Sequence, residues 1–104
     1  MILMIEFTNK RLKLVYSAIP KGIERPVTAK AIKLKTGVPT RDVYSCINLL
    51  VTKYAVPIGG LRQEGKHGYF IATSRDELAE AITPLERHTQ HMKERLTALK
   101  MIDL

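Results

Sequence analysis

The stretch TAKAIKLKTGVPTRDVYSCINLLVTKY, residues 28–54, decides the fold of this chain. Thr28 is a favourable N-cap for a helix of about two turns, because its hydroxyl can accept a hydrogen bond from an unpaired backbone N–H. Gly37 supplies the backbone conformation that ends such a helix. Pro39 with Thr40 then opens a second helix, since the N–H that proline lacks has no partner in a first turn and threonine can cap. The stretch therefore predicts two helices joined by a tight turn.

The second of these helices has an apolar face and a polar face. Apolar residues recur at the i, i+4, i+7, i+11 spacing of one buried stripe: Val43, Ile47, Leu50 and Tyr54, with Cys46 beside it. The opposite face carries side chains that can donate or accept hydrogen bonds: Arg41, Tyr44 or Ser45, Asn48 and Thr52. One side of this helix is thus expected in a core and the other at the surface.

The first helix of the pair is expected to place Ala31 and Ile32 in the core, and Val38 is expected to anchor the turn there. Its basic residues are left to solvent or to phosphate: Lys30, Lys33 and Lys35. Leu34 lies among these lysines, opposite the buried face, and nothing in the sequence explains it.

The segments before and after this pair have patterns of their own. A helix capped by Thr8 or Asn9 is expected to run to about Ile19, with an apolar face made of Leu12, Val15, Tyr16 and Ile19. Residues 25–27 are expected to be extended, because the residue before proline is pushed out of the α region. Two apolar segments, residues 55–62 and 69–73, enclose a polar, glycine-containing tip at residues 63–68, which predicts a β-hairpin.

Ser74 is expected to cap a last helix, whose acidic first turn suits the helix dipole. Apolar positions along it alternate steps of four and three residues: Leu78, Ile82, Leu85, Thr89 (the one polar member), Met92, Leu96 and Leu99. This is the 3.5-residue repeat of a helix that packs against another helix. The stripe either covers the core of its own domain or meets a second subunit, and its length of roughly 30 Å at 1.5 Å per residue favours a homodimer. Pro84 is expected to kink this helix or divide it.

Length and charge place any polyanion contact on the first part of the chain. The 104 residues suffice for one core, which predicts one domain, residues 1–74, with a helical extension, residues 75–104. Thirteen Lys and Arg against four Asp and Glu give residues 1–75 a net charge of +9, whereas residues 76–104 carry −2. A basic body with a slightly acidic tail favours a polyanion partner on the body. A generally basic, solvated surface is the alternative.

Cys46 is the one cysteine of the chain, which excludes an intrachain disulfide and a thiol-based zinc site. The apolar run at residues 1–5 is too short to span a bilayer and has no basic residue before it, as a secretory signal would. We therefore expect a cytoplasmic protein without membrane contact.

The order helix, Gly37-Val38-Pro39 turn, helix and hairpin resembles the winged helix-turn-helix family of DNA-binding proteins. Within that family the chain is similar to small DNA-binding proteins of phages and prophages, in which a wing ending Gly-Tyr-Phe is followed by Ser-x-x-Glu-Leu and a long helix. The corresponding residues here are 68–70 and 74–78. The resemblance covers about two thirds of the chain and implies an α+β, mostly helical fold: a winged helix-turn-helix with a C-terminal coiled-coil-like helix.

The resemblance also implies the positions that contact double-stranded DNA. The base-reading positions fall on Thr40, Arg41, Tyr44, Ser45 and Asn48, and the backbone contacts of the wing fall on Arg62, Lys66 and His67. An arginine can donate two hydrogen bonds to guanine and an asparagine can pair with adenine, which favours Arg41 and Asn48 for direct readout. The lysines at 30, 33 and 35 are expected near phosphates, which position without specifying. Asp42 departs from this pattern, and we expect it to accept from helix N–H groups or to pair with a basic neighbour.

Enzymatic chemistry is not indicated. The sequence has no nucleophile motif, phosphate-cradling glycine loop or paired carboxylates. His88 and His91 are three residues apart but have no third ligand nearby in sequence, so neither a metal nor a cofactor is expected. The expected function is sequence-specific DNA binding by a homodimeric transcription regulator of a phage or mobile element. A replication or recombination accessory protein and a winged protein-interaction module are the alternatives.

Overall fold

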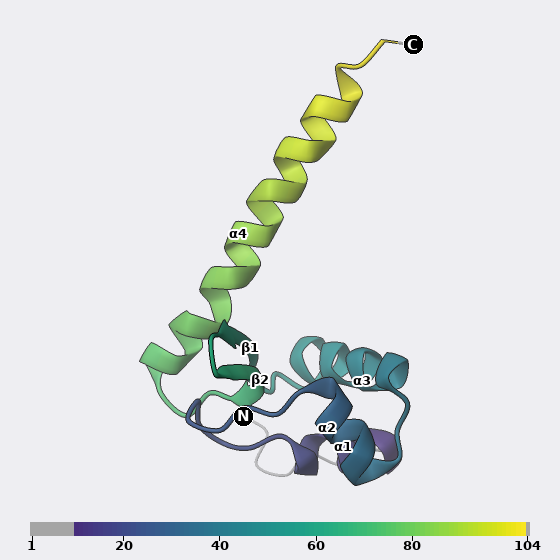
Figure 1. The fold of residues 1–104 in the computed structure, drawn as a ribbon, viewed down its shortest axis with the longest axis vertical. Coiled ribbons are helices and arrows are strands. Elements are labelled where there is room, and N and C mark those ends of the chain that lie inside the picture. Colours follow the sequence, from purple (N-terminus) through teal and green to yellow (C-terminus); the bar gives the residue numbers. More distant parts are fainter. Residues whose placement is uncertain (1–9, 104) are drawn as a thin grey trace.

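Three short helices pack around one apolar core in the computed structural model, which describes residues 10–103. They are α1 (Lys10–Ala18), α2 (Ala29–Thr36) and α3 (Thr40–Thr52). The strands β1 (Ile58–Gln63) and β2 (Lys66–Ile71) form an antiparallel hairpin, and α4 (Arg75–Lys100) follows it. The described part of the chain is therefore an α+β fold in which helix predominates (Figure 1).

The predicted apolar faces of α1 and α3 are confirmed. Val15, Val43 and Leu50 are fully buried in one cluster with Leu12, Ile19, Cys46 and Ile47. Tyr16 and Tyr54 pack against its edge. The caps at Thr8 and Asn9 lie outside the described residues.

One core position in α2 is wrong in the sequence-based prediction. Ile32 is buried as expected, but Ala31 is exposed, and Ala29 takes its place in the core. The reason is helical geometry: Ala29 lies three residues before Ile32 and so shares its face, whereas Ala31 lies about 100° around the helix.

The turn between α2 and α3 has the expected signals with one change. Thr28 caps α2 by accepting from the N–H of Ala31 at 3.1 Å, and Gly37 ends it with a φ of 78°. Val38 is buried, as predicted. Thr40 does not cap α3, because Pro39 occupies the N-cap position and Thr40 is the first helical residue.

The hairpin is confirmed, but its strands are longer than expected. Pairing continues from Ile58 with Ile71 out to Gln63 with Lys66, so only residues 64–65 form the turn. Arg62 and His67 are therefore cross-strand partners rather than loop residues. Residues opposite each other in a pair point to the same face of the sheet, so both side chains project from one face.

The extended segment before α2 lies beside β2, as the preproline rule predicts. Val27 exchanges two backbone hydrogen bonds with Tyr69, at 3.0 and 2.6 Å. This contact ties the start of the α2–α3 pair to the hairpin, so the two units are held in a defined relation.

Helix α4 begins on the hairpin and then projects from the body (Figure 1). The Ser74 hydroxyl caps it by accepting from the Glu77 N–H at 3.2 Å, as predicted. Ala81 packs in a second cluster with Leu61 and Phe70. The radius of gyration is 15.9 Å, whereas a compact chain of this length has about 13 Å.

Pro84 lies inside α4 and does not divide it, because the helix is continuous from Arg75–Lys100. The helix changes direction near its base (Figure 1), in keeping with the i−4 hydrogen bond that a proline cannot donate. Within residues 10–103, no helix combines the length and the apolar character needed to cross a bilayer.

Candidate nucleic-acid interface

The polar face of α3 points away from the core, as predicted. The Arg41 side chain is 92% exposed, and Tyr44, Ser45 and Asn48 are exposed with it. Thr40, in the first turn, is half-buried. The Ser45 hydroxyl donates to the Arg41 carbonyl at 3.3 Å. The face therefore presents a guanidinium, an amide, a phenol and a hydroxyl to solvent.

The acid on this helix is neutralised from within the fold. Asp42 accepts a hydrogen bond in an ion pair with Arg11 of α1, and the Arg41 Nε lies 3.9 Å from its second oxygen. The prediction that Asp42 pairs with a basic residue is confirmed, although the main partner is distant in sequence. The pair leaves little negative charge on α3 to repel a polyanion.

A groove of about 1300 Å³ lies between α3, the hairpin and the base of α4. It brings together predicted residues from two elements, Tyr44 and Asn48 of α3 with Arg62 and His67 of the hairpin. The other predicted contact residues are not part of its lining: Thr40, Arg41, Ser45, Lys66, Lys30, Lys33 and Lys35. The predicted set is thus divided between the groove and the surface around it.

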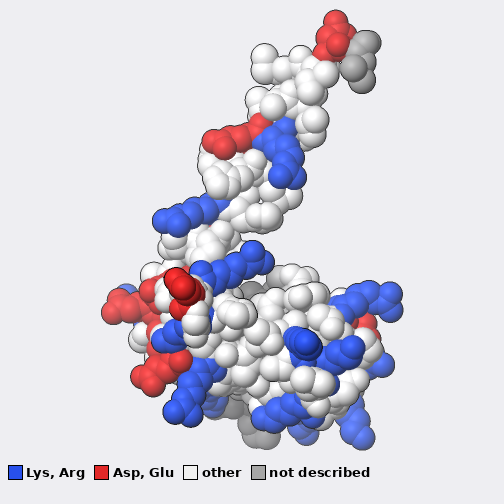
Figure 2. Space-filling view, viewed as in Figure 1, with Lys and Arg blue, Asp and Glu red and all other residues white. Residues whose placement is uncertain are grey.

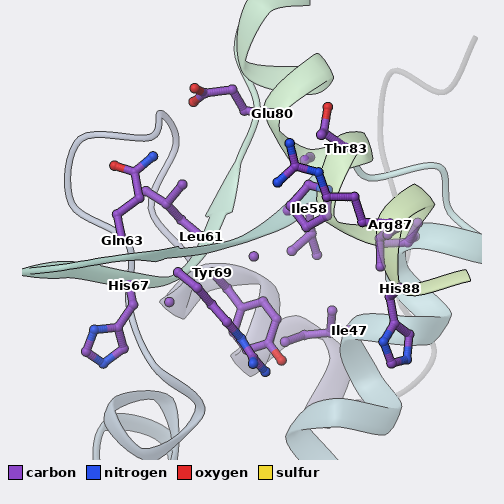
Figure 3. A pocket seen from close by; sticks show the side chains of 18 of the residues that line it. Ile47, Ile58, Leu61, Gln63, His67, Tyr69, Glu80, Thr83, Arg87 and His88 are labelled. Carbon is purple, nitrogen blue, oxygen red and sulfur yellow. The ribbon is translucent and has the colours of Figure 1, made fainter. Parts of the chain in front are cut away.

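Helix α4 supplies groove residues that the sequence analysis missed. Arg87, His88 and His91 line the groove opposite α3. Figure 3 shows His88 extending from α4 toward α3 and Tyr69 extending from β2 toward Ile47. The available signal was helical spacing, because these positions form the face of α4 that does not carry the apolar stripe.

The two histidines of α4 do not make a metal centre with a third ligand. In the part of the chain that the structure describes, no group of three or more His, Cys, Asp and Glu side chains could hold a metal ion. His88 and His91 instead share the groove with Arg62 and Arg87, and Glu80 is the acidic residue of its lining. The groove wall is therefore mainly cationic and hydrogen-bonding.

Tyrosines link the floor of the groove. The rings of Tyr44 and Tyr69 meet edge to face, with centroids 6.5 Å apart. Burial raises the pKa of Tyr69 above its usual range, and nearby Tyr44 raises it further, whereas the cation of Arg62 lowers it. Tyr69 is accordingly a neutral hydrogen-bond donor at physiological pH.

The lysines of α2 stand outside the groove. Lys30, Lys33 and Lys35 are all exposed, as predicted. Figure 2 shows Lys and Arg spread over the body, while Asp and Glu gather around the base of α4 and again at its far end. The charge asymmetry inferred from the sequence is thus also a spatial asymmetry. Leu34, among these lysines, is 78% exposed, and no contact in the structure explains it.

The apolar stripe of α4 is not covered by the body. Its six large apolar members are between 40% and 65% exposed: Leu78, Ile82, Leu85, Met92, Leu96 and Leu99. Ala81 is the buried residue of α4. The explanation that the stripe serves only the core of its own domain therefore does not hold for these side chains.

The arrangement suits recognition of a polyanion with readable edges. Guanidinium groups and lysines attract phosphates, and an exposed arginine and asparagine on a helix can form bidentate hydrogen bonds with bases. A comparison of the chain with protein-family models, with curated proteins and with solved structures finds no match.

Proposed function

We propose that this protein binds double-stranded DNA in a sequence-specific manner, as a winged helix-turn-helix protein. In this proposal α3 is the recognition helix, the β1–β2 hairpin is the wing, and a homodimer regulates transcription on a phage or mobile-element genome. The observation that carries the proposal is the cationic groove, to which α3, the hairpin and α4 each contribute.

The exposed face of α3 has the size and chemistry that a major groove accepts. A helix with its side chains is about 10–12 Å across, and the major groove is about 12 Å wide. Arg41 and Asn48 read base edges, and Thr40, Tyr44 and Ser45 supply further contacts from the same face. Because the Asp42 carboxylate is paired with Arg11, it does not oppose the approach of phosphate.

Phosphate contacts surround this face. Lys30, Lys33 and Lys35 are exposed on α2, next in the chain before the turn into α3. Arg62 and Arg87 line the groove on the other side. Cations on both sides of a reading helix fix the register of the protein on the duplex without specifying sequence.

Gel shifts and footprints on fragments of the encoding genome test the proposal. Replacing Arg41 by Ala should weaken specific binding by about 1–3 kcal/mol and leave binding to random DNA nearly unchanged. Equal losses on specific and random DNA would refute the readout role of Arg41. A footprint at a promoter supports transcription regulation, a footprint at an origin or attachment site assigns the same binding to replication or recombination, and no shift on any fragment refutes DNA binding.

A further inference from the structure

The uncovered stripe of α4 has a register that can be read residue by residue. In heptad notation Ile82, Thr89 and Leu96 occupy a positions, and the d positions are Leu78, Leu85, Met92 and Leu99. These residues lie on the face of α4 away from the groove. A stripe of this spacing packs its side chains between those of a second helix with the same spacing.

The charges beside the stripe distinguish the two possible orientations of such a pair. The e positions that flank it are Glu86, Lys93 and Lys100, and the g positions include His88 and Arg95. In a parallel pair each g residue faces the next e residue of the other chain. Arg95 would then face the partner's Lys100 and His88 the partner's Lys93, so Glu86 would face no cation.

In an antiparallel pair, e positions face e positions. With the apolar layers in register, Glu86 faces the partner's Lys93, and symmetry repeats the contact. The apolar layers then match along the whole stripe: Ile82 with the partner's Leu99, Leu85 with the partner's Leu96, and Thr89 with the partner's Met92. The antiparallel arrangement thus gains two opposite-charge contacts and avoids facing Arg95 with a lysine.

The surface of the stripe fits this register. A shallow hollow lies on it, and its lining includes Ile82, Thr89, Glu86 and Lys93. Thr89 is the smallest side chain of the stripe, and in the antiparallel register it faces the long, flexible Met92 of the partner. A small residue opposite a large one allows the two helices to approach closely.

We propose that α4 pairs in antiparallel orientation with α4 of a second copy, with the two-fold axis between Thr89 and Met92. This inference specifies the homodimer of the proposed function and does not depend on DNA binding. Ala81, where α4 is docked on the body, lies nine to ten residues from the axis. At 1.5 Å per residue the two docking points are about 28 Å apart along the pair.

That separation bears on the site the dimer would bind. Half-sites one helical turn apart are about 34–36 Å from centre to centre, close to the spacing of the two docking points. A parallel pair would instead bring both bodies to one end of the coiled coil. The orientation of α4 therefore sets the distance between the two reading helices.

Cysteine cross-linking of the full chain without DNA tests the orientation. In the antiparallel register Leu85 of one chain lies opposite Leu96 of the other, while two Leu85 residues are about 16 Å apart along the pair. A disulfide requires Cα atoms within about 7 Å. The double variant L85C/L96C should form a disulfide-linked dimer on mild oxidation, whereas L85C alone and L96C alone should not.

The controls are the unchanged chain, whose Cys46 is buried, and E94C, whose position lies on the outer face of α4. Neither should cross-link. Cross-linking by each single variant would show a parallel pair, and no cross-link in the double variant would show that these residues do not meet; either result overturns the proposal. Circular dichroism of each variant checks that α4 is still helical.

A charge exchange gives a second, independent readout. E86K should raise the dimer dissociation constant several-fold in sedimentation equilibrium, because it places lysines opposite each other. E86K/K93E should restore the value of the unchanged chain. Failure of the second change to restore it would overturn the register, and failure of DNA binding with both tests positive would refute only the proposed function.

Discussion

Gly59 controls how α4 is seated on the hairpin, and replacing it by Ala gives a sharp test of this packing. A Cβ at position 59 would lie 2.4 Å from the Ala81 Cβ and 2.9 Å from Cζ of Phe70. Ala81 and Phe70 are both buried, so neither can move aside freely. Overpacking of this kind costs about 1–3 kcal/mol of unfolding free energy.

Thermal unfolding followed by circular dichroism measures this loss. For a domain of this size each kcal/mol lowers Tm by about 4–8 °C. The matched control is Gly60→Ala in the same strand, where the nearest atom to the new methyl would be Cε1 of Tyr69 at 3.8 Å. That distance is an ordinary van der Waals contact, so Gly60→Ala should leave Tm within a few degrees of the unchanged chain.

A double variant locates the strain. Ala81→Gly alone should cost about 1 kcal/mol through helix propensity, but in the Gly59→Ala background it removes the closest clash and should cost less or become stabilising. If Gly59→Ala and Gly60→Ala had equal Tm values, or if the two changes at 59 and 81 were simply additive, the packing of α4 on the hairpin would be refuted.

Three further outcomes follow from the charges and the core. Replacing Lys33 and Lys35 by Ala should weaken binding to all DNA sequences and reduce the magnitude of the salt slope by about 1 per lost phosphate contact; an unchanged slope would show that these lysines do not touch DNA. Burial raises the pKa of the Cys46 thiol, with Asp42 adding to the effect, so iodoacetamide should modify it slowly in the folded protein and rapidly in urea; fast modification of the folded protein would contradict the packing of α3. The backbone N–H of Thr73 lowers the pKa of Glu77, so this carboxylate stabilises the folded state at neutral pH and that contribution is lost as pH falls from the ordinary carboxyl range through the lowered pKa; Glu77→Gln should therefore flatten the acid limb of stability against pH, and an identical acid limb would contradict the cap.

Local signals in the sequence were sufficient for most element boundaries. Thr28 and Ser74 cap helices because a hydroxyl beside an unpaired backbone N–H acts within one turn, and no distant residue is needed. The apolar stripe of α3 was equally readable, since its spacing reports one face of a helix. Ala31 was misplaced because an eight-residue helix with alanines at both 29 and 31 offers two similar faces, and packing against α1 and α3 decides between them.

The candidate site depended much more on tertiary structure. The pairing of Asp42 with Arg11 joins residues 31 positions apart, and the groove joins Asn48 to Arg62 and Arg87 from three separate elements. The sequence by itself determined which side chains are exposed on α3 and which stripe of α4 is apolar, because periodicity is a property of a single helix. Only the tertiary structure decided that the opposite face of α4 completes the groove, because the direction in which that helix leaves the hairpin is set by the contact of Ala81 with Gly59 and Phe70.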